Sequence, residues 1–141
     1  MPNDEQNLAE QYIAAFNSHD WNKIGPFFAD DCLHEDMASG MSFHGKQDLK
    51  DYMDGIFTRA PNVKLKLESA FVGGDWMAYE WTYSGRYTGD EPGRKATGRE
   101  FSIRGVSVSE LRDGKIRRNR DYYDMTTFLQ QLGLMPTTPV V

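Results

Sequence analysis

The chain has 141 residues, 39% of them hydrophobic and 13% aromatic, so it is long enough for one domain, residues 1–141, with a buried core. Its 16 Lys and Arg residues against 21 Asp and Glu give a net charge of −5, which argues against nucleic acid or anionic lipid as a partner. Cys32 is the only cysteine, which excludes an internal disulfide, and without a membrane span or signal peptide we expect a cytoplasmic protein that does not contact membranes.

The first 61 residues favour helices. Apolar residues recur at helical spacing between Leu8 and Phe16, and Asn3 with Gln6 forms a candidate capping pair, so a first helix should reach about residue 17. Asp20 is placed to cap a short second helix. The other elements predicted in this half are a break at 25–26, a short strand at about 31–37, and a helix from about 45 that stops before Pro61.

Beyond Pro61 the hydrophobic period changes from helical to alternating, which is typical of strands. Four strands are predicted around 63–67, 77–83, 101–111 and 115–123, with turns at 73–75 and 113–114, a Gly-rich connection at 89–98, and a closing helix at 126–132. Helices followed by long antiparallel strands predict an α+β fold in which the helices cover one face of a bent sheet.

Asp121 is the first candidate for chemistry. It lies on the last predicted strand next to Tyr122 and Tyr123, and packing of that strand against helices would remove water from the carboxylate. Desolvation raises a carboxylate pKa toward neutrality, where the group can both accept and donate a proton. The alternative is an ion pair with one of the three arginines between residues 117 and 120, which would lower the pKa instead.

The run from Asp113 to Asp124, which holds a turn, a strand with its carboxylate and the start of a helix, resembles the C-terminal signature of the SnoaL-like polyketide cyclases. These belong to the ketosteroid isomerase-like, or nuclear transport factor 2-like, superfamily. The resemblance implies a curved, mostly antiparallel sheet wrapped with N-terminal helices into a cone with an internal cavity, and it makes Asp121 the general acid/base. Further segments that carry it are 15–17, 28–31, 43–45, 83–89 and 97–101.

One position departs from the family pattern. Cyclases of this family that close an anthracycline ring carry a histidine on the strand before the last turn, and the matching position here is Ser107. A serine does not exchange protons near neutral pH as an imidazole does. The family's ring-closing chemistry is therefore in question for this chain.

The register of the last hairpin decides what faces Asp121. A two-residue loop, 113–114, would place Val106 opposite Asp121, whereas a three-residue loop, 112–114, shifts the pairing by one. We predict the three-residue loop, because it matches the family arrangement. The resulting pairs are Gly105 with Asp121 and Ser107 with Asn119.

His34 is the second candidate. On the first predicted strand it shares a face with Asp36, while Glu35 points the other way. A histidine oriented by a carboxylate is a candidate base that could compensate for Ser107; the alternative is a surface histidine among acids. Together with His44 these residues also suggest metal ligands, but their spacing matches no known motif, so no metal is predicted.

A pocket for a small hydrophobic ligand is predicted between the helices and the strands. Six residues are assigned to substrate binding: Tyr12, Phe16, Trp81, Tyr83, Ser107 and Asn119. Plain core packing would use the same aromatic side chains.

Three functions remain open. The first is a cofactor-independent acid/base enzyme that performs an aldol-type cyclisation or an isomerisation, with Asp121 and His34 as catalytic residues. The second is a non-catalytic ligand-binding module on the same fold. The third is an epoxide hydrolase, ranked last because segment 84–86 lacks the aspartate of the Arg-x-Asp pair that such relatives use. The resemblance also implies a homodimer formed through the outer face of the sheet.

Overall fold

The computed structural model describes the backbone of residues 4–136 and the side chains of residues 8–136. The candidate capping residue Asn3 lies outside this range. The helices are α1 (Asp4–Asn17), α2 (Trp21–Ile24), the 3-10 helix η1 (Gly25–Phe27), α3 (Gly45–Arg59) and α4 (Met125–Leu132). The strands are β1 (Phe28–Asp36), β2 (Met41–His44), β3 (Lys64–Gly73), β4 (Trp76–Arg86), β5 (Glu100–Arg112) and β6 (Lys115–Tyr123).

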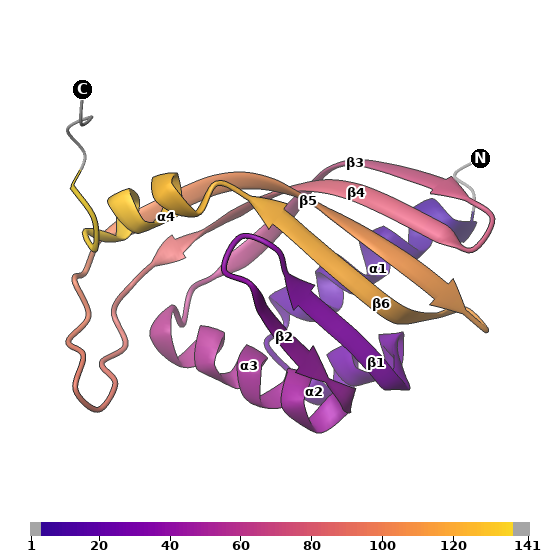
Figure 1. Ribbon diagram of the computed structural model, residues 1–141, viewed down its shortest axis with the longest axis horizontal. Coiled ribbons are helices and arrows are strands. Elements are labelled where there is room, and N and C mark those ends of the chain that lie inside the picture. Colours follow the sequence, from indigo (N-terminus) through magenta and orange to yellow (C-terminus); the bar gives the residue numbers. More distant parts are fainter. Residues whose placement is uncertain (1–3, 137–141) are drawn as a thin grey trace.

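The six strands form one curved sheet in the order β2-β1-β6-β5-β4-β3. Only the β1–β6 pair is parallel, and the other neighbours are antiparallel. Helices α1 and α3 lie on one side of the sheet, and α4 lies at the end near the connection between β4 and β5 (Figure 1). The predicted α+β class, with a mostly antiparallel curved sheet and helices on one face, is confirmed.

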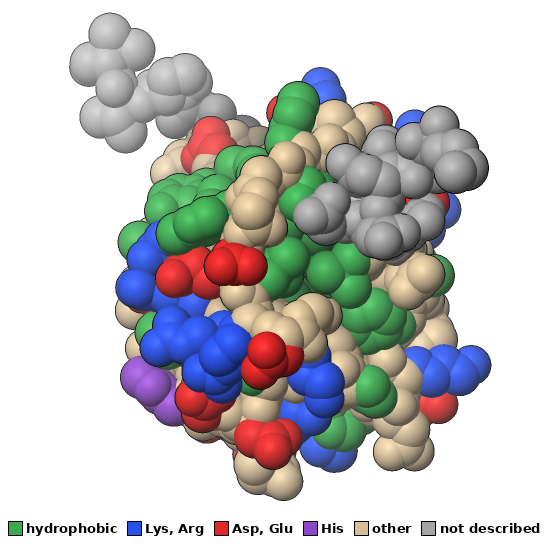
Figure 2. Space-filling model, turned by 90° about the vertical axis from the view of Figure 1, so that its right-hand side faces the viewer, with side chains coloured by type: hydrophobic (Ala, Val, Ile, Leu, Met, Phe, Trp, Pro, Cys, Tyr) green, Lys and Arg blue, Asp and Glu red, His purple; other side chains and the backbone are tan. Residues whose placement is uncertain are grey.

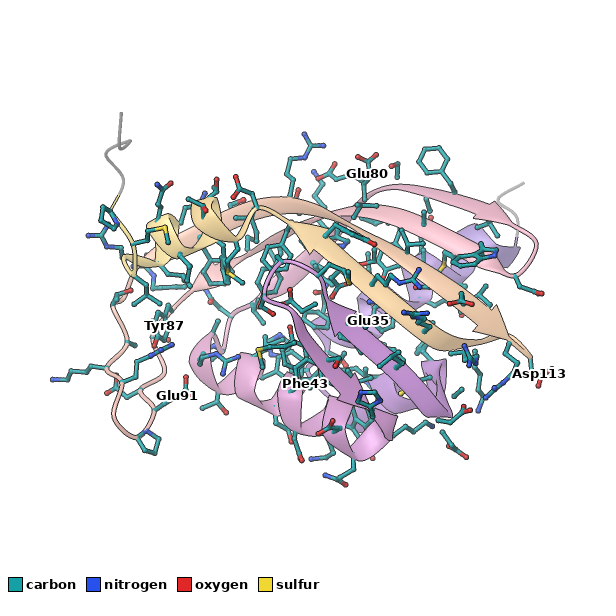
Figure 3. The ribbon with its side chains drawn as sticks, viewed as in Figure 1. Glu35, Phe43, Glu80, Tyr87, Glu91 and Asp113 are labelled. Atoms are coloured by element: carbon teal, nitrogen blue, oxygen red, sulfur yellow. The ribbon has the colours of Figure 1, made fainter. Side chains whose placement is uncertain are left out.

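The alternating pattern of β4 explains how the sheet separates its two faces. Met77, Tyr79 and Trp81 are buried on the inner face, while Glu80 between them is exposed. Figure 3 shows the Glu80 side chain on the side of the sheet away from the helices. The inner face of β4 therefore supplies aromatic side chains to the space under the sheet.

Three helix ends follow directly from the sequence. The Asp20 side chain accepts a hydrogen bond of 2.9 Å from the Asn22 backbone, as predicted for the cap of α2. Asp124, the last residue of the family signature, caps α4 by accepting from the Thr127 backbone at 3.1 Å. Gly133 ends α4 with a φ of 78°, the left-handed conformation that glycine adopts without strain. The final aspartate of the signature thus has a structural role.

The β5–β6 hairpin differs from the prediction. Its loop is the two-residue turn Asp113-Gly114, but one extra residue in β6, Arg117, forms a bulge that shifts the pairing beyond it. Both registers considered from the sequence are therefore wrong, because neither included a bulge. The observed pairs are Ser107 with Asp121, Ser109 with Asn119 and Gly105 with Tyr123.

Strand β2 was not predicted, and β1 begins earlier than expected. Met41 to His44 pair antiparallel with the end of β1 as the outermost strand of the sheet. The sequence of this segment indicated only the start of α3. Cys32 lies inside β1 and is buried.

Candidate active site

A cavity of about 550 Å³ lies between the inner face of the sheet and helices α1, α3 and α4. Most of its lining is aromatic or aliphatic, with a few polar groups that converge from β1, β5 and β6. All eight candidate site residues predicted from the sequence line this cavity: Tyr12, Phe16, His34, Trp81, Tyr83, Ser107, Asn119 and Asp121.

Asp121 is the centre of the polar cluster. Its Oδ1 accepts hydrogen bonds from Ser107 Oγ at 2.6 Å and from Asn119 Nδ2 at 2.7 Å. Its Oδ2 lies 3.1 Å from His34 Nε2. The side chain keeps a fifth of its surface exposed, which is the part that faces the cavity. One carboxylate oxygen is therefore saturated, and the other retains room for a ligand.

The direction of the pKa shift of Asp121 is opposite to the prediction. Burial raises the pKa of this carboxyl group, but the attraction to His34 and the hydrogen bonds from His34, Ser107 and Asn119 outweigh burial and hold the pKa below its usual value. The alternative ion pair with an arginine is also wrong, because Arg118 and Arg120 pair with Glu35. Asp121 is thus an ionised carboxylate at neutral pH, suited to accept a proton rather than donate one.

His34 is buried, with 4% of its surface exposed, so it is not the surface histidine of the alternative interpretation. Its partners are Asp121, through Nε2, and Asn119, whose Nδ2 lies 3.3 Å from Nδ1. Asp36, the partner expected from the sequence, forms its hydrogen bonds with Ala38, Ser39 and Tyr123 instead. Because Nδ1 faces an amide N–H, the neutral form of the imidazole carries its proton on Nε2, directed at Asp121.

A second row of hydrogen bonds fixes these groups. Ser109, which is fully buried, donates to Asn119 Oδ1 at 2.7 Å and so sets the orientation of the Asn119 amide. Trp81 Nε1 donates to Ser107 Oγ at 2.9 Å, which directs the Ser107 hydroxyl proton toward Asp121. Both contacts restrict the cluster to one arrangement.

Two cavity residues outside the eight predicted site residues form a separate polar pair: Tyr123, and Asp36, which was considered only as a partner of His34. Tyr123 donates a hydrogen bond of 2.6 Å to Asp36 Oδ2, and Asp36 Oδ1 accepts from the backbone N–H groups of Ala38 and Ser39. Burial, reinforced by this hydrogen bond, raises the pKa of Tyr123, so its phenol stays protonated. The alternation of β6 could have indicated Tyr123, which lies two residues after Asp121.

Tyr52 is the third residue missed. Tyr52 lies on α3 and packs on Phe43, with 4.1 Å between the ring centroids. It also lines the cavity, however, and burial, followed by the negative charges of Asp121 and Asp36, raises its pKa well above the usual value. Its phenol is therefore a permanent hydrogen-bond donor.

No group of three or more metal-ligating side chains occurs within the part of the chain that the structure describes. In the same range, no helix combines the length and the apolar character needed to cross a membrane.

Comparison with known proteins identifies relatives over most of the chain. The sequence profile of the SnoaL-like polyketide cyclase family matches residues 6–132. Aklanonic acid methyl ester cyclase DnrD from Streptomyces peucetius is 38% identical over 66 residues, and DauD from Streptomyces sp. (strain C5), which carries the same enzyme name, is equally similar. These matches cover 47% of this chain and 46% and 41% of the relatives, so the chain spans less than half of the length of either.

Solved structures with the same fold cover more of the chain. A protein with a ketosteroid isomerase-like fold from Catenulispora acidiphila DSM 44928, in complex with trimethylamine, superposes with a TM-score of 0.79 at 24% identity over 91% of this chain and 93% of that chain. IdmH from Streptomyces antibioticus gives a TM-score of 0.79 at 21% identity over 93% and 99% of the respective chains. These two likenesses show the fold, and the profile match over residues 6–132 shows that the chain belongs to the SnoaL-like polyketide cyclase family.

Proposed function

We propose that the protein is a cofactor-independent acid/base enzyme in which Asp121 removes a proton from a carbon next to a carbonyl group of a small hydrophobic, polyketide-like substrate. The observation that carries this proposal is the place of the Asp121 carboxylate at the wall of an aromatic cavity, where His34, Ser107 and Asn119 hold it. Among the residues that the structure describes, its Oδ2 receives only the contact from His34. That oxygen is the one that would meet the substrate.

The proposed step moves one proton. The C–H bond of the substrate breaks, its proton goes to Asp121 Oδ2, and its electron pair forms an enolate. In an aldol-type cyclisation the enolate carbon attacks a second carbonyl of the same molecule, and Asp121 returns the proton to the resulting alkoxide. In an isomerisation Asp121 returns it to another carbon. Tyr52, with its protonated phenol at the cavity wall, supplies a donor for the enolate oxygen.

His34 and Ser107 act on Asp121 in this scheme. His34 directs its Nε2 proton at the carboxylate and has no ring nitrogen left for the substrate, so it orients the base. Ser107 donates to Oδ1 and stands where ring-closing cyclases of the family have a histidine. Asp121 alone must therefore hold the proton that the substrate loses in the first step. Both an isomerisation and a cyclisation are compatible with this.

Aklanonic acid methyl ester is the substrate to test first, because it appears in the names of two relatives. Wild-type protein and Asp121→Asn are compared for ring closure and for exchange of the acidic carbon-bound protons in D₂O. We expect Asp121→Asn to lower the rate about 100-fold or more, because the asparagine keeps the shape of the side chain but is not a base. Its affinity for the ester should stay within about threefold of the wild-type value. The exposed turn variant Asp113→Asn is the matched control and should behave as wild type. Undiminished turnover by Asp121→Asn would contradict the proposal.

The second candidate is a non-catalytic ligand-binding module. A protein of the same fold has been solved with trimethylamine bound, which supports small-ligand binding by this architecture. Affinity for the ester without turnover or proton exchange in the wild type would favour this alternative. The epoxide hydrolase remains third: Asp90, the first aspartate after Arg86 in the chain, lies in the connection between β4 and β5, where it accepts a hydrogen bond of 2.8 Å from the Ala96 backbone.

A homodimer through the outer sheet face, a cytoplasmic location and independence of any cofactor belong to the same proposal. Three large hydrophobic side chains on the outer face support the dimer: Phe71, Trp76 and Tyr122 are each more than 40% exposed.

A further inference from the structure

The cavity has a second polar region, away from Asp121, where the connection between β4 and β5 meets the end of α3. Tyr87 and Arg94, both from this connection, line the cavity there. The backbone N–H groups of Thr88 and Gly89 donate to Arg59 O at 3.0 Å and hold the connection against α3. Figure 3 shows Tyr87 near this end of the molecule, with Glu91 further along the same connection and Asp113 at the opposite end.

Tyr87 is rigidly placed but incompletely bonded. Its backbone N–H donates to Arg99 O at 2.9 Å, and its carbonyl accepts from Gly98 N at 2.8 Å. Its side chain is buried, with 3% exposed, yet its hydroxyl makes no hydrogen bond to any described residue. Within the described part of the chain, no other buried side-chain nitrogen or oxygen lacks a partner. A buried hydroxyl without a partner lowers stability, so its presence needs an explanation.

The charged side chains around the cavity indicate which kind of ligand group the Tyr87 hydroxyl would bind. Arg59 is 3.6 Å from Glu91 and is thereby neutralised, whereas Arg94 forms no ion pair among residues 8–136. The other polar region of the cavity carries the carboxylates of Asp36 and Asp121. A second oxygen acceptor on the ligand, beyond the carbonyl next to its acidic C–H group, is therefore attracted toward Tyr87 and Arg94.

We propose that the Tyr87 hydroxyl and the Arg94 guanidinium form a subsite for a carbonyl or carboxylate oxygen at the end of the substrate remote from Asp121. The subsite deepens the proposed function and rests on it for the presence of a small hydrophobic ligand. It would orient such a ligand with its acidic C–H group toward Asp121.

Three naphthalene probes separate the contributions: 2-methylnaphthalene has no acceptor, 2-acetylnaphthalene has a neutral carbonyl, and 2-naphthoate has a carboxylate. Binding is followed by the fluorescence of Trp81, which lines the cavity. Tyr87→Phe should weaken the binding of 2-acetylnaphthalene and of 2-naphthoate about tenfold, because each loses a hydrogen bond. The binding of 2-methylnaphthalene should not change. Arg94→Gln should weaken the binding of 2-naphthoate alone.

The Tm of the free protein separates a ligand-binding role of Tyr87 from a purely structural one. A structural tyrosine stabilises the fold, so its replacement by Phe should lower the Tm. Tyr87→Phe removes an unpaired hydroxyl, so the Tm of the free protein should stay constant or rise. Tyr123→Phe removes a phenol that is bonded to Asp36, so its Tm should fall. Tyr122→Phe, on the outer face, is the matched control and should change neither the Tm nor the affinity for any probe.

The outcomes are distinguishable. Equal affinity of wild type and Tyr87→Phe for all bound probes, or a lower Tm for Tyr87→Phe, would overturn the subsite and leave the role of Asp121 intact. Failure of wild type to bind any of the three probes would overturn the ligand cavity, and with it both the proposed function and the subsite.

Discussion

The hydrogen bonds around Asp121 determine what kind of base it can be. A desolvated carboxylate is a strong base but is protonated for part of the time near neutrality, whereas a carboxylate with a lowered pKa stays ionised and is a weaker base. Asp121 is of the second kind, because His34, Ser107 and Asn119 together outweigh its burial. Its catalytic contribution would then rest on positioning of the substrate against Oδ2 more than on basicity.

Ser109 offers a test of this positioning that needs no substrate. Its hydroxyl fixes the Asn119 amide, and the amide in turn faces both Asp121 and His34 Nδ1. In wild type, ¹⁵N NMR should therefore show His34 with its proton on Nε2. We expect Ser109→Ala to release the amide and produce a mixture of tautomers.

The control for this experiment lies on the same strand. Ser102 on β5 is exposed, and Ser102→Ala should leave the His34 signals unchanged. Identical His34 spectra for wild type and Ser109→Ala would show that Ser109 does not set the tautomer.

The predicted site residues came from the family resemblance and from the alternation of side chains along the strands. The error over the partner of His34 has one cause. The family resemblance singled out Ser107 and Asp121, and alternation placed His34 on the same strand face as Asp36; all four line the cavity. Alternation could not tell which of two carboxylates His34 would meet. Asp36 shares its strand face, but the parallel β1–β6 pair brings Asp121 closer, and strand pairing is not written in local sequence.

At the level of elements, a single residue changed the register. The sequence Asp113-Gly114 indicated a tight turn, and such a turn is present with positive φ values of 53° and 75°. The bulge at Arg117 has no comparable signal, because it depends on how β6 pairs with β1 and β5 at once. Strand β2 was missed for a similar reason, since its four residues are stabilised by pairing with β1.

Packing between β4 and β5 depends on Gly105. A Cβ atom at this position would lie 2.3 Å from a ring carbon of Trp81, so the indole occupies the space of a side chain. Gly105→Ala should lower the free energy of unfolding by about 1–3 kcal/mol, as overpacking does, and it should displace Trp81 from Ser107. Chemical denaturation measures the loss.

Gly73, at the end of β3, is the matched control for this substitution. A Cβ there meets nothing within 4 Å, and its φ is not in the left-handed region. Gly73→Ala should therefore change stability by less than about 0.5 kcal/mol. Equal effects of the two substitutions would mean that Trp81 does not lie against Gly105.

For the whole molecule, the two faces of the sheet predict two different interactions. The inner face encloses the cavity, whereas the outer face presents hydrophobic side chains next to the ion pairs of Glu35 with Arg118 and Arg120. Figure 2, which views the end of the molecule that carries the β3–β4 turn, shows hydrophobic side chains from the upper left through the centre, with acidic and basic side chains alternating below them on the left. A large apolar patch with a charged rim is typical of a protein interface.

Light scattering after gel filtration tests the proposed dimer. Wild type should have twice the 16.1 kDa mass of one chain, and Phe71→Glu or Trp76→Glu should reduce it to that of a monomer, since a buried unpaired charge opposes association. Met135→Glu places the same charge at an exposed position beyond α4, outside the sheet, and should leave the dimer intact. A monomeric wild type would contradict the proposal.

The pKa of Asp121, measured by ¹³C NMR titration of its carboxyl carbon, tests the site most directly. We predict a midpoint below the usual value of about 3.9, because the contacts with His34, Ser107 and Asn119 favour the ionised form. The stability that these contacts provide should then be complete above about pH 4 and be lost as the pH falls through the midpoint. A midpoint above about 5 would contradict an ionised base held by these three side chains.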